Sequence, residues 1–330
     1  MRLFGKTGRQ VSVVGQGCWQ FGGDWGAVSD STALEVLGTA VAQGITLIDT
    51  ADVYGDGHSE QLVGQFLHSI GGAEANGLTV ITKMGRRADP HVAGAYCYDN
   101  FRAWLDRSRT NLGMEQIHLV QLHCPPSSVY ANQQVYDDLD RLVNEGVIAA
   151  YGVSVETVAE ALEAMKHENV ATVQIICNIL RRKPLDTVLP VAAANGVGII
   201  ARVPLASGLL TGRFTADTQF PPEDHRNYNR HGESFNVGET FSGVPYEAGL
   251  EAAAEVVRIA DDVGCTPAQL ALRWIIDQPG ITTVIPGASR PDQAAANAAA
   301  AEVPPLSAEV LTELKDAYDK YAAPHVADKW

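Results

Sequence analysis

The chain has 330 residues, of which 46% are hydrophobic and 19% are charged, and its formal net charge is −15 at pH 7. This composition is ordinary for a globular protein with a sizeable core, and it excludes a disordered or collagen-like chain. A chain this acidic repels nucleic acid and anionic membrane surfaces, so neither is an expected partner.

Short apolar runs alternate with longer amphipathic segments along the chain. Residues 3–4 and 11–14, separated by a Gly-Lys-Thr-Gly turn at 5–8, predict a small N-terminal hairpin. A strand is expected at 14–17, followed by a helix at 29–43 that Ser29 can cap and Gly44 ends. Further strands are expected at 45–48, 78–82, 117–122, 148–153, 172–176, 197–201 and 282–285. Further helices are expected at 58–70, 100–111, 133–145, 157–167, 185–195, 247–263 and 267–277.

Eight strands that alternate with helices predict βαβ units and a parallel sheet. Strands such as 173–176 and 198–201 are apolar on both faces, as buried parallel strands are. Eight units favour a closed (β/α)₈ TIM barrel over an open sheet. A polar stretch at 215–245, rich in Gly, Pro and Asn, predicts a long loop after strand seven, and 306–320 predicts a closing helix. Because no linker interrupts the alternation, we expect one domain over 1–330.

Three common motifs are absent. Gly15 and Gly17 follow a strand, but the next glycine is Gly22, so the dinucleotide fingerprint G-x-G-x-x-G is not formed. Nothing upstream of the Gly-Lys-Thr at 5–7 supplies a phosphate loop, and Ser154 and Ser207 lack the G-x-S-x-G frame of a hydrolase. If the chain binds a dinucleotide, it therefore does so without a Rossmann fold.

The cysteines and the N-terminus bear on the compartment. The chain has five cysteines: Cys18, Cys97, Cys124, Cys177 and Cys265. Because their number is odd and no two are spaced C-x-x-C, a reducing compartment is favoured over a disulfide framework or a zinc site. The N-terminus lacks the apolar core of a signal peptide, and no apolar run is long enough to span a bilayer. We expect a cytoplasmic protein without a membrane partner; an oligomer is possible but nothing in the sequence indicates one.

Four chemically active side chains fall where predicted strands end. Asp49 and Tyr54 follow strand two, Lys83 ends strand three and His123 ends strand four. In (β/α)₈ enzymes these ends form the active-site mouth. A lysine beside a tyrosine lowers the pKa of the phenol, an aspartate can orient that lysine, and a histidine can hydrogen-bond a substrate oxygen. Singly, each residue has a structural alternative: a helix cap for Asp49, rim packing for Tyr54, a solvated charge for Lys83 and a satisfied core histidine for His123.

The segment Ile48-Asp49-Thr50-Ala51-Asp52-Val53-Tyr54-Gly55, followed by Ser59-Glu60, resembles the signature of the aldo-keto reductase superfamily. Lys83 in Val-Ile-Thr-Lys and His123 in Val-Gln-Leu-His fall where that family keeps its lysine and histidine. The resemblance extends from Gly17 to Asn297 and is closest to the bacterial branch related to potassium-channel β subunits. It implies NADPH-dependent reduction of an aldehyde or ketone to an alcohol, with Tyr54 as proton donor. The alternative that it leaves open is an NADPH-binding regulatory module with slow or no turnover.

The resemblance also implies a cofactor site. Ser154 and Gln174 match positions that hold the nicotinamide carboxamide, the segment 204–212 resembles the one along the pyrophosphate, and 285–290 resembles the adenosine-phosphate segment. A hydroxyl and a guanidinium at a helix N-terminus suit a 2′-phosphate, which favours NADPH over NADH. The implied cofactor residues are Ser154, Gln174, Asn178, Arg202, Pro204, Leu205, Ser207, Gly208, Leu210, Gly287, Ser289, Arg290, Gln293 and Asn297.

Two residues depart from the family pattern. Arg202 stands where an aromatic residue usually stacks on the nicotinamide, and it could stack instead or form a salt bridge. Cys177 replaces a usual tyrosine. Basic residues that could serve an anionic cofactor are Arg181, Arg182, Arg202, Arg213 and Arg290.

The substrate is expected to meet Trp19 and Trp25, in the loop after strand one, together with Tyr54 and His123, whereas Trp104 is expected in the core. Arg86, Arg87 and His91 could recognise an anionic substrate or could simply be solvated.

A metal-dependent barrel enzyme is the third hypothesis, but no carboxylate and histidine ligand cluster is evident, and Cys124 and His123 point to opposite faces of a strand. No metal is therefore expected.

Overall fold

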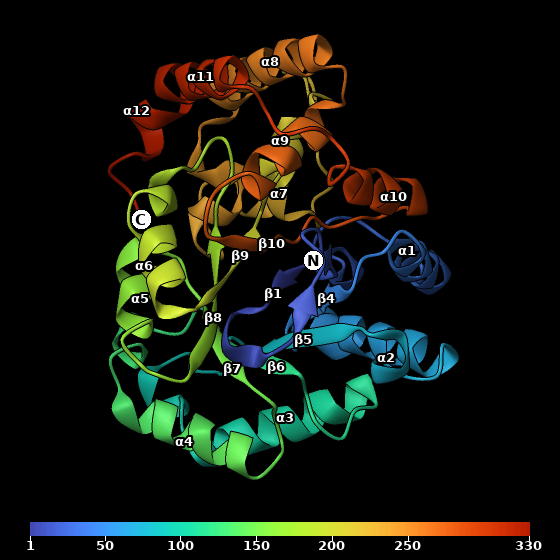
Figure 1. Cartoon of the computed structure of the whole chain (residues 1–330), viewed down its shortest axis with the longest axis vertical. Coiled ribbons are helices and arrows are strands. Elements are labelled where there is room, and N and C mark those ends of the chain that lie inside the picture. Colours follow the sequence, from blue (N-terminus) through green and yellow to red (C-terminus); the bar gives the residue numbers. More distant parts are fainter.

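The computed structural model describes all residues, 1–330, and places eight parallel strands in one sheet in the order β10-β9-β8-β7-β6-β5-β4-β3. Parallel bridges Val14–Val284 and Gly17–Gly287 join the first and last strands and close the barrel. Figure 1 shows the strands at the centre of the molecule. The strands are β3 (Gln16–Gly17), β4 (Leu47–Asp49), β5 (Thr79–Met84), β6 (Leu119–His123), β7 (Tyr151–Ser154), β8 (Val170–Ile176), β9 (Gly198–Arg202) and β10 (Ile281–Val284).

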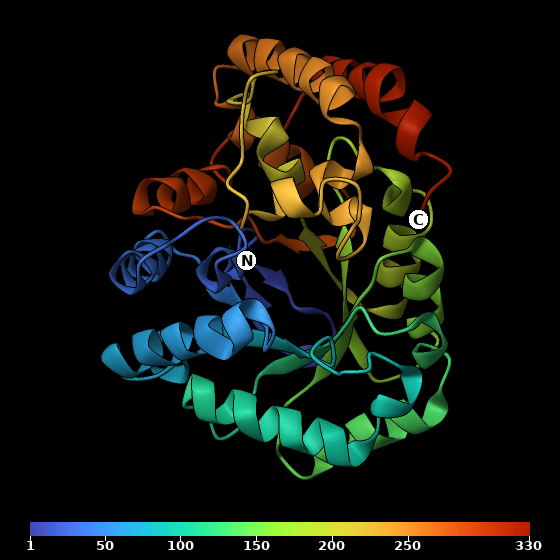
Figure 2. The same ribbon diagram turned by 180° about the vertical axis from the view of Figure 1, so that it is seen from behind.

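Helices surround the barrel, as Figures 1 and 2 show from opposite sides. Side-chain caps fix several helix starts: Ser29 accepts from the N–H of Thr32, and Thr157 and Thr266 each form a capping box. The helices are α1 (Asp30–Ala42), α2 (His58–Ser69), α3 (Tyr98–Leu112), α4 (Gln133–Asn144), α5 (Val158–Ala164), α6 (Val188–Asn195), α7 (His225–Tyr228), α8 (Tyr246–Val263), α9 (Pro267–Ile276), α10 (Pro291–Ala299), α11 (Ala308–Ala317) and α12 (Ala323–Val326).

The N-terminal hairpin, β1 (Arg2–Leu3) and β2 (Gln10–Val11), packs against the end of the barrel where the strands begin. Phe4 and Val11 are fully buried in one cluster with barrel residues Leu47, Ile81, Leu119, Ala171, Ile200 and Ile285. The backbone approaches closely: a Cβ on Gly5, at φ +54°, would lie 2.0 Å from the carbonyl oxygen of Ala171. This end is filled, so only the opposite end can admit a ligand.

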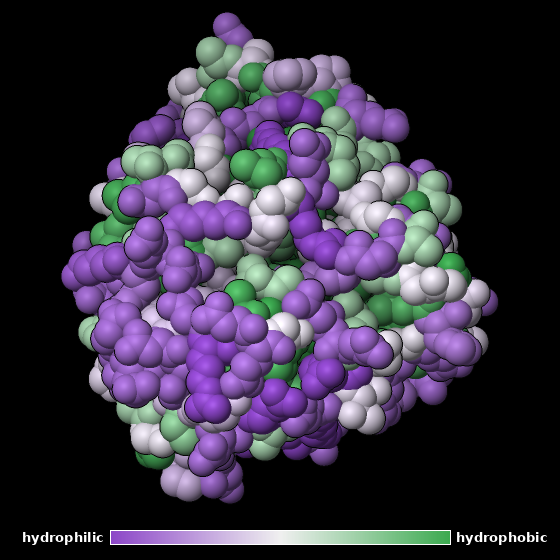
Figure 3. Space-filling view, turned by 60° about the horizontal axis from the view of Figure 1, so that its bottom comes forward, coloured by the Kyte–Doolittle hydropathy of each residue, from purple (hydrophilic) through white to green (hydrophobic).

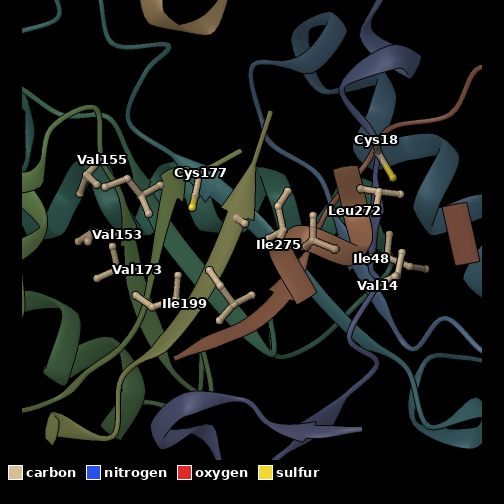
Figure 4. Close-up of a cluster of buried hydrophobic side chains, with 14 of the residues drawn as sticks. Val14, Cys18, Ile48, Val153, Val155, Val173, Cys177, Ile199, Leu272 and Ile275 are labelled. Carbon is tan, nitrogen blue, oxygen red and sulfur yellow. The ribbon is translucent and has the colours of Figure 1, made fainter. Parts of the chain in front are cut away.

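A larger core fills the space between the barrel and its helices. Figure 4 shows strand residues such as Val153 and Ile199 in one buried cluster with Leu272 and Ile275 of α9. Most of the face in Figure 3 is hydrophilic, and its hydrophobic residues are scattered in small groups, in keeping with the acidic composition. None of the helices combines the length and the apolar character that crossing a membrane requires.

The predicted (β/α)₈ barrel, with its hairpin and its long loop after strand seven, is confirmed. Element boundaries differ by a few residues, mainly because β4 and β7 begin later than the apolar runs that predict them. The segment 215–245 contains α7 and short 3₁₀ turns at Val237–Glu239 and Phe241–Gly243. The closing helix is longer than predicted, because a π turn at Tyr318–Ala322 joins α11 to α12.

Candidate active site

Strand register gathers the four predicted residues at one end of the barrel. Asp49 and His123 are the last residues of β4 and β6, Lys83 lies near the end of β5, and Tyr54 begins a 3₁₀ turn after β4. The fully buried Lys83 ammonium donates to Asp49 Oδ1 at 2.6 Å, to the carbonyl of Thr50 at 2.9 Å and to the Tyr54 hydroxyl at 3.2 Å. These three bonds use all of the donors of an ammonium. The phenol oxygen accepts from Lys83, so its own proton is free to point elsewhere.

The second oxygen of Asp49 is also held. Gln174 Nε2, on β8, donates to Asp49 Oδ2 at 2.8 Å and to Gln121 Oε1 at 2.9 Å. The carboxylate therefore bridges an ammonium and an amide, which fixes its orientation. Gln121 was missed from the sequence, although it precedes His123 by two residues and therefore faces the same side of β6.

Burial shifts the acid–base behaviour of the tetrad. Burial raises the pKa of Tyr54 to about 12, and the nearby Lys83 ammonium only partly opposes the increase. The expectation that Lys83 would bring this pKa below its ordinary value is therefore wrong for the protein alone, because the loss of solvent outweighs the attraction of one ammonium. Burial also holds the pKa of His123 well below its usual range, and the cations Arg86 and Lys83 add to the decrease. His123 is thus neutral near pH 7, and its buried Nδ1 has no hydrogen-bond partner in the protein.

Asp49, Tyr54 and His123 border a cavity of about 610 Å³ that reaches to α10, and Lys83 lies behind its wall. Trp19 stacks on Tyr54, with ring centroids 6.0 Å apart and an angle of 18° between the planes, and Trp25 meets Trp19 edge-on at 5.3 Å. The indole N–H of Trp19 donates to Asp24 Oδ2 at 2.9 Å, which holds the ring in place. Trp104 instead packs against Tyr96 and Phe101, away from the cavity. The mouth therefore offers aromatic walls beside the phenol.

Most of the predicted cofactor residues line this cavity: Gln174, Arg202, Pro204, Leu205, Ser207, Gly208, Gly287, Ser289, Gln293 and Asn297. Ser154, Asn178, Leu210 and Arg290 do not. Asn178 Nδ2 donates instead to the carbonyl of Val203 and to Ser242 Oγ, so it supports the cavity wall from behind. Arg290 is half exposed and pairs with Asp292. Contact between any of the predicted cofactor residues and a cofactor stays a prediction.

Arg202 is engaged in polar contacts in this structure. Its guanidinium donates to the carbonyl of Val155 at 3.1 Å and pairs with Glu239 Oε1 at 3.5 Å. Arg86 Nη1 bonds the same oxygen of Glu239 at 3.0 Å. Glu239 was missed because it lies in the loop at 215–245, and nothing local marks it.

The other predicted basic residues are divided. Arg213 lines the cavity, whereas Arg181 stacks on Trp330 and Arg182 lies over Trp274. Arg87 pairs with Asp56 and His91 bonds Tyr96; neither lines the cavity. One group of potential metal ligands, Cys124, Glu156 and Glu239, brings its ligand atoms within 4.8 Å of one another, but Arg202 already contacts the first and last of them.

Asp52 is a buried carboxyl of the same segment with no hydrogen-bond partner on either oxygen. Burial raises its pKa to about 7, and the nearby Glu60 carboxylate contributes to the increase. Since the folded state holds this proton more tightly than the unfolded chain does, Asp52 lowers the free energy of unfolding as pH rises from about 4 to about 7. The full effect is on the order of 4 kcal/mol at pH values above that window.

We therefore expect Asp52→Asn to raise the free energy of unfolding by about 4 kcal/mol near pH 8 and to have little effect on it near pH 4. Guanidinium chloride unfolding of both proteins at the two pH values measures the difference. A stability difference that is the same at both pH values would show that the carboxylate charge is not its cause.

Comparison with known proteins agrees with this geometry. The model of the Aldo/keto reductase family matches residues 13–319. The aldo-keto reductase YhdN of Bacillus subtilis is 30% identical over 292 residues, which cover 87% of this chain and 84% of the relative. A putative voltage-gated potassium channel subunit beta of Schizosaccharomyces pombe is 28% identical, with coverage of 96% and 92%. The glycerol dehydrogenase AKR11B4 of Gluconobacter oxydans has a solved structure with a TM-score of 0.76 and 28% identity, over 97% of this chain and 94% of that one. The chain belongs to the aldo/keto reductase family of oxidoreductases.

Proposed function

We propose that the protein reduces an aldehyde or ketone to an alcohol with NADPH, and that Tyr54 donates the proton. The observation that carries the proposal is the hydrogen bond from Lys83 Nζ to the Tyr54 oxygen at 3.2 Å. It leaves the phenol proton available to the cavity, where a carbonyl oxygen would gain negative charge as it is reduced. An ammonium also stabilises the tyrosinate that remains after the proton has left.

The cavity wall suits a dinucleotide. Gly287 and Gln20 both line the cavity, and the Gln20 side chain lies so close to Gly287 that a Cβ there would fall 1.9 Å from Gln20 Oε1. That buried oxygen has no partner in the protein and can accept a hydrogen bond from a ligand. Ser289 and Gln293 supply polar groups at the start of α10, where a helix N-terminus favours an anion. An aldo-keto reductase of Klebsiella pneumoniae, solved in complex with NADPH, shares the fold with a TM-score of 0.73. When bound, NADPH supplies the hydride.

The residues of the chain divide the remaining work. Asp49 keeps Lys83 charged and oriented, and Lys83 holds the phenol oxygen in position. His123 is neutral and borders the cavity, so it can donate one hydrogen bond to the carbonyl oxygen without competing as an acid. Trp19 covers one face of Tyr54 and limits the access of water to the phenol.

A screen of aldehydes, ketones and sugars, with NADPH and NADH in parallel, tests this proposal. We expect NADPH oxidation with at least one substrate class and slower oxidation of NADH. Tight NADPH binding without oxidation by any member of the panel would favour the regulatory alternative instead.

Discrimination between the two cofactors can be assigned to a residue. We expect Arg290→Met to raise the KM for NADPH by roughly tenfold and to leave the KM for NADH unchanged, because only NADPH carries the 2′-phosphate that a guanidinium would bind. Arg258→Met is the matched control: its guanidinium is similarly exposed and ion-paired, but it lies on α8, whereas Arg290 directly precedes α10, the helix that the cavity reaches. If both KM values change equally, or neither changes, Arg290 does not bind the 2′-phosphate.

A further inference from the structure

Two guanidinium groups line the same cavity as His123 and share a single carboxylate. Arg86, just after β5, and Arg202, at the end of β9, both line the cavity. Arg86 donates a hydrogen bond to Glu239 Oε1 at 3.0 Å, and Arg202 forms an ion pair with the same oxygen at 3.5 Å. Arg202 and Glu239 are more than nine-tenths buried. Burial alone would raise the pKa of Glu239, but the two guanidinium groups bring it down to about 2. Glu239 is therefore charged at any working pH, and this cluster of two cations and one anion keeps one positive charge in excess.

The rest of the lining does not cancel this charge. Four arginines and three acids line the cavity, which leaves one positive charge in a chain whose net charge is −15: Arg86, Arg202, Arg213 and Arg226 against Asp24, Asp49 and Glu239. Behind the wall, Lys83 and Asp224 cancel each other, and so do Arg181 and Glu156, which both lie close to Glu239. Asp24 has no cationic partner, but its two oxygens already accept hydrogen bonds from Trp19 and Tyr228.

Arg86 has donors to spare. A guanidinium can donate five N–H groups, and Arg86 makes one hydrogen bond within the protein, from Nη1 to Glu239. Its side chain retains 20% of its exposure, whereas that of Arg202 retains 9%. The ring of Phe235, 5.5 Å from the guanidinium carbon, holds Arg86 against one side of the cavity. Because Arg86 and His123 line the same cavity, a ligand bound there can reach both side chains.

We propose that Arg86 binds a carboxylate on the substrate, so that the preferred substrates are carbonyl compounds that carry a second, anionic group. This inference rests on the proposed carbonyl reduction and names its substrate class. A guanidinium fork matches a carboxylate in two parallel hydrogen bonds, and the low polarity of a buried site strengthens both. Glu239 and Arg202 are positioning residues here: the carboxylate anchors Arg86, and Arg202 offsets the charge of that carboxylate.

Matched substrates test the proposal. Reduction of 3- and 4-formylbenzoate is compared with that of 3- and 4-formylbenzamide, which have the same shape without the charge. For at least one isomer we expect kcat/KM to be about tenfold or more higher for the acid than for the amide. In Arg86→Met this ratio falls to about one, and in Arg86→Lys it is intermediate because the charge remains without the fork.

Arg87→Met is the control, since Arg87 is adjacent in sequence but pairs with Asp56 outside the cavity. It keeps the wild-type ratio of acid to amide. Thermal unfolding verifies that each variant is folded. A wild-type ratio of one for both isomers, or a ratio that survives in Arg86→Met, would overturn the proposal.

A binding measurement separates this inference from the proposed function. Calorimetric titration with 3- and 4-(hydroxymethyl)benzoate, against the corresponding benzamides, requires no turnover. If no aldehyde is reduced, the proposed function fails, and tighter binding of an acid that is lost in Arg86→Met still supports the carboxylate site. Equal binding of acids and amides contradicts the site even in an active enzyme.

Discussion

Replacing Tyr54 with phenylalanine is expected to lower kcat for carbonyl reduction by roughly 10²- to 10⁴-fold, which is the usual contribution of a positioned proton donor. The substitution removes one oxygen and leaves the ring that stacks on Trp19. It also removes one of the three acceptors of Lys83, while Asp49 Oδ1 and the carbonyl of Thr50 remain. Steady-state kinetics and fluorescence titration of NADPH measure the two effects separately.

NADPH binding should change little in Tyr54→Phe, because the predicted cofactor contacts lie elsewhere in the cavity. If the variant retains full activity, Tyr54 is not the proton donor. A variant that loses cofactor binding together with activity would show that the Tyr54 hydroxyl has a structural role instead.

Replacing Lys83 with methionine is expected to abolish turnover and to destabilise the fold by about 3–5 kcal/mol, the usual effect of leaving a buried charge without its partner. Asp49 and Lys83 are both almost completely buried, and Asp49 would retain only the amide of Gln174 as a donor. Denaturant unfolding near pH 7 gives the change in the free energy of unfolding.

The double variant Asp49→Asn with Lys83→Met distinguishes stability from chemistry. Removing the second charge should recover much of the lost stability, since no uncompensated ion remains. Activity should not return, because the phenol still lacks its ammonium. A double variant as unstable as Lys83→Met would mean that packing, and not the unpaired carboxylate, causes the loss.

Local sequence signals were sufficient to predict the barrel and to predict that the four tetrad residues lie together at one end of it. Asp49, Lys83 and His123 each follow an apolar run that forms a strand, and parallel strands bring their ends together. Gln121 could have been found in the same way, from the period of two along β6.

The charged cluster beside His123 could not be predicted in this manner. Arg86 and Glu239 are 153 residues apart, and Glu239 lies in a segment without periodicity, so only the folded chain pairs them. The raised pKa of Tyr54 is equally non-local, because it depends on the packing that buries the phenol. Electrostatic properties of buried groups follow from the complete arrangement of neighbours, which the order of residue types does not specify.

Transfer of deuterium is the most direct measurement of carbonyl reduction at this site. The protein is mixed with NADPH deuterated at either C4 position of the nicotinamide and with an aldehyde from the screen, and the alcohol is analysed by mass spectrometry. We expect one of the two labelled cofactors to place a single deuterium on the carbinol carbon, while the hydroxyl proton comes from solvent through Tyr54. An alcohol without deuterium from either cofactor, or bound NADPH that no carbonyl compound oxidises, would contradict the proposed function.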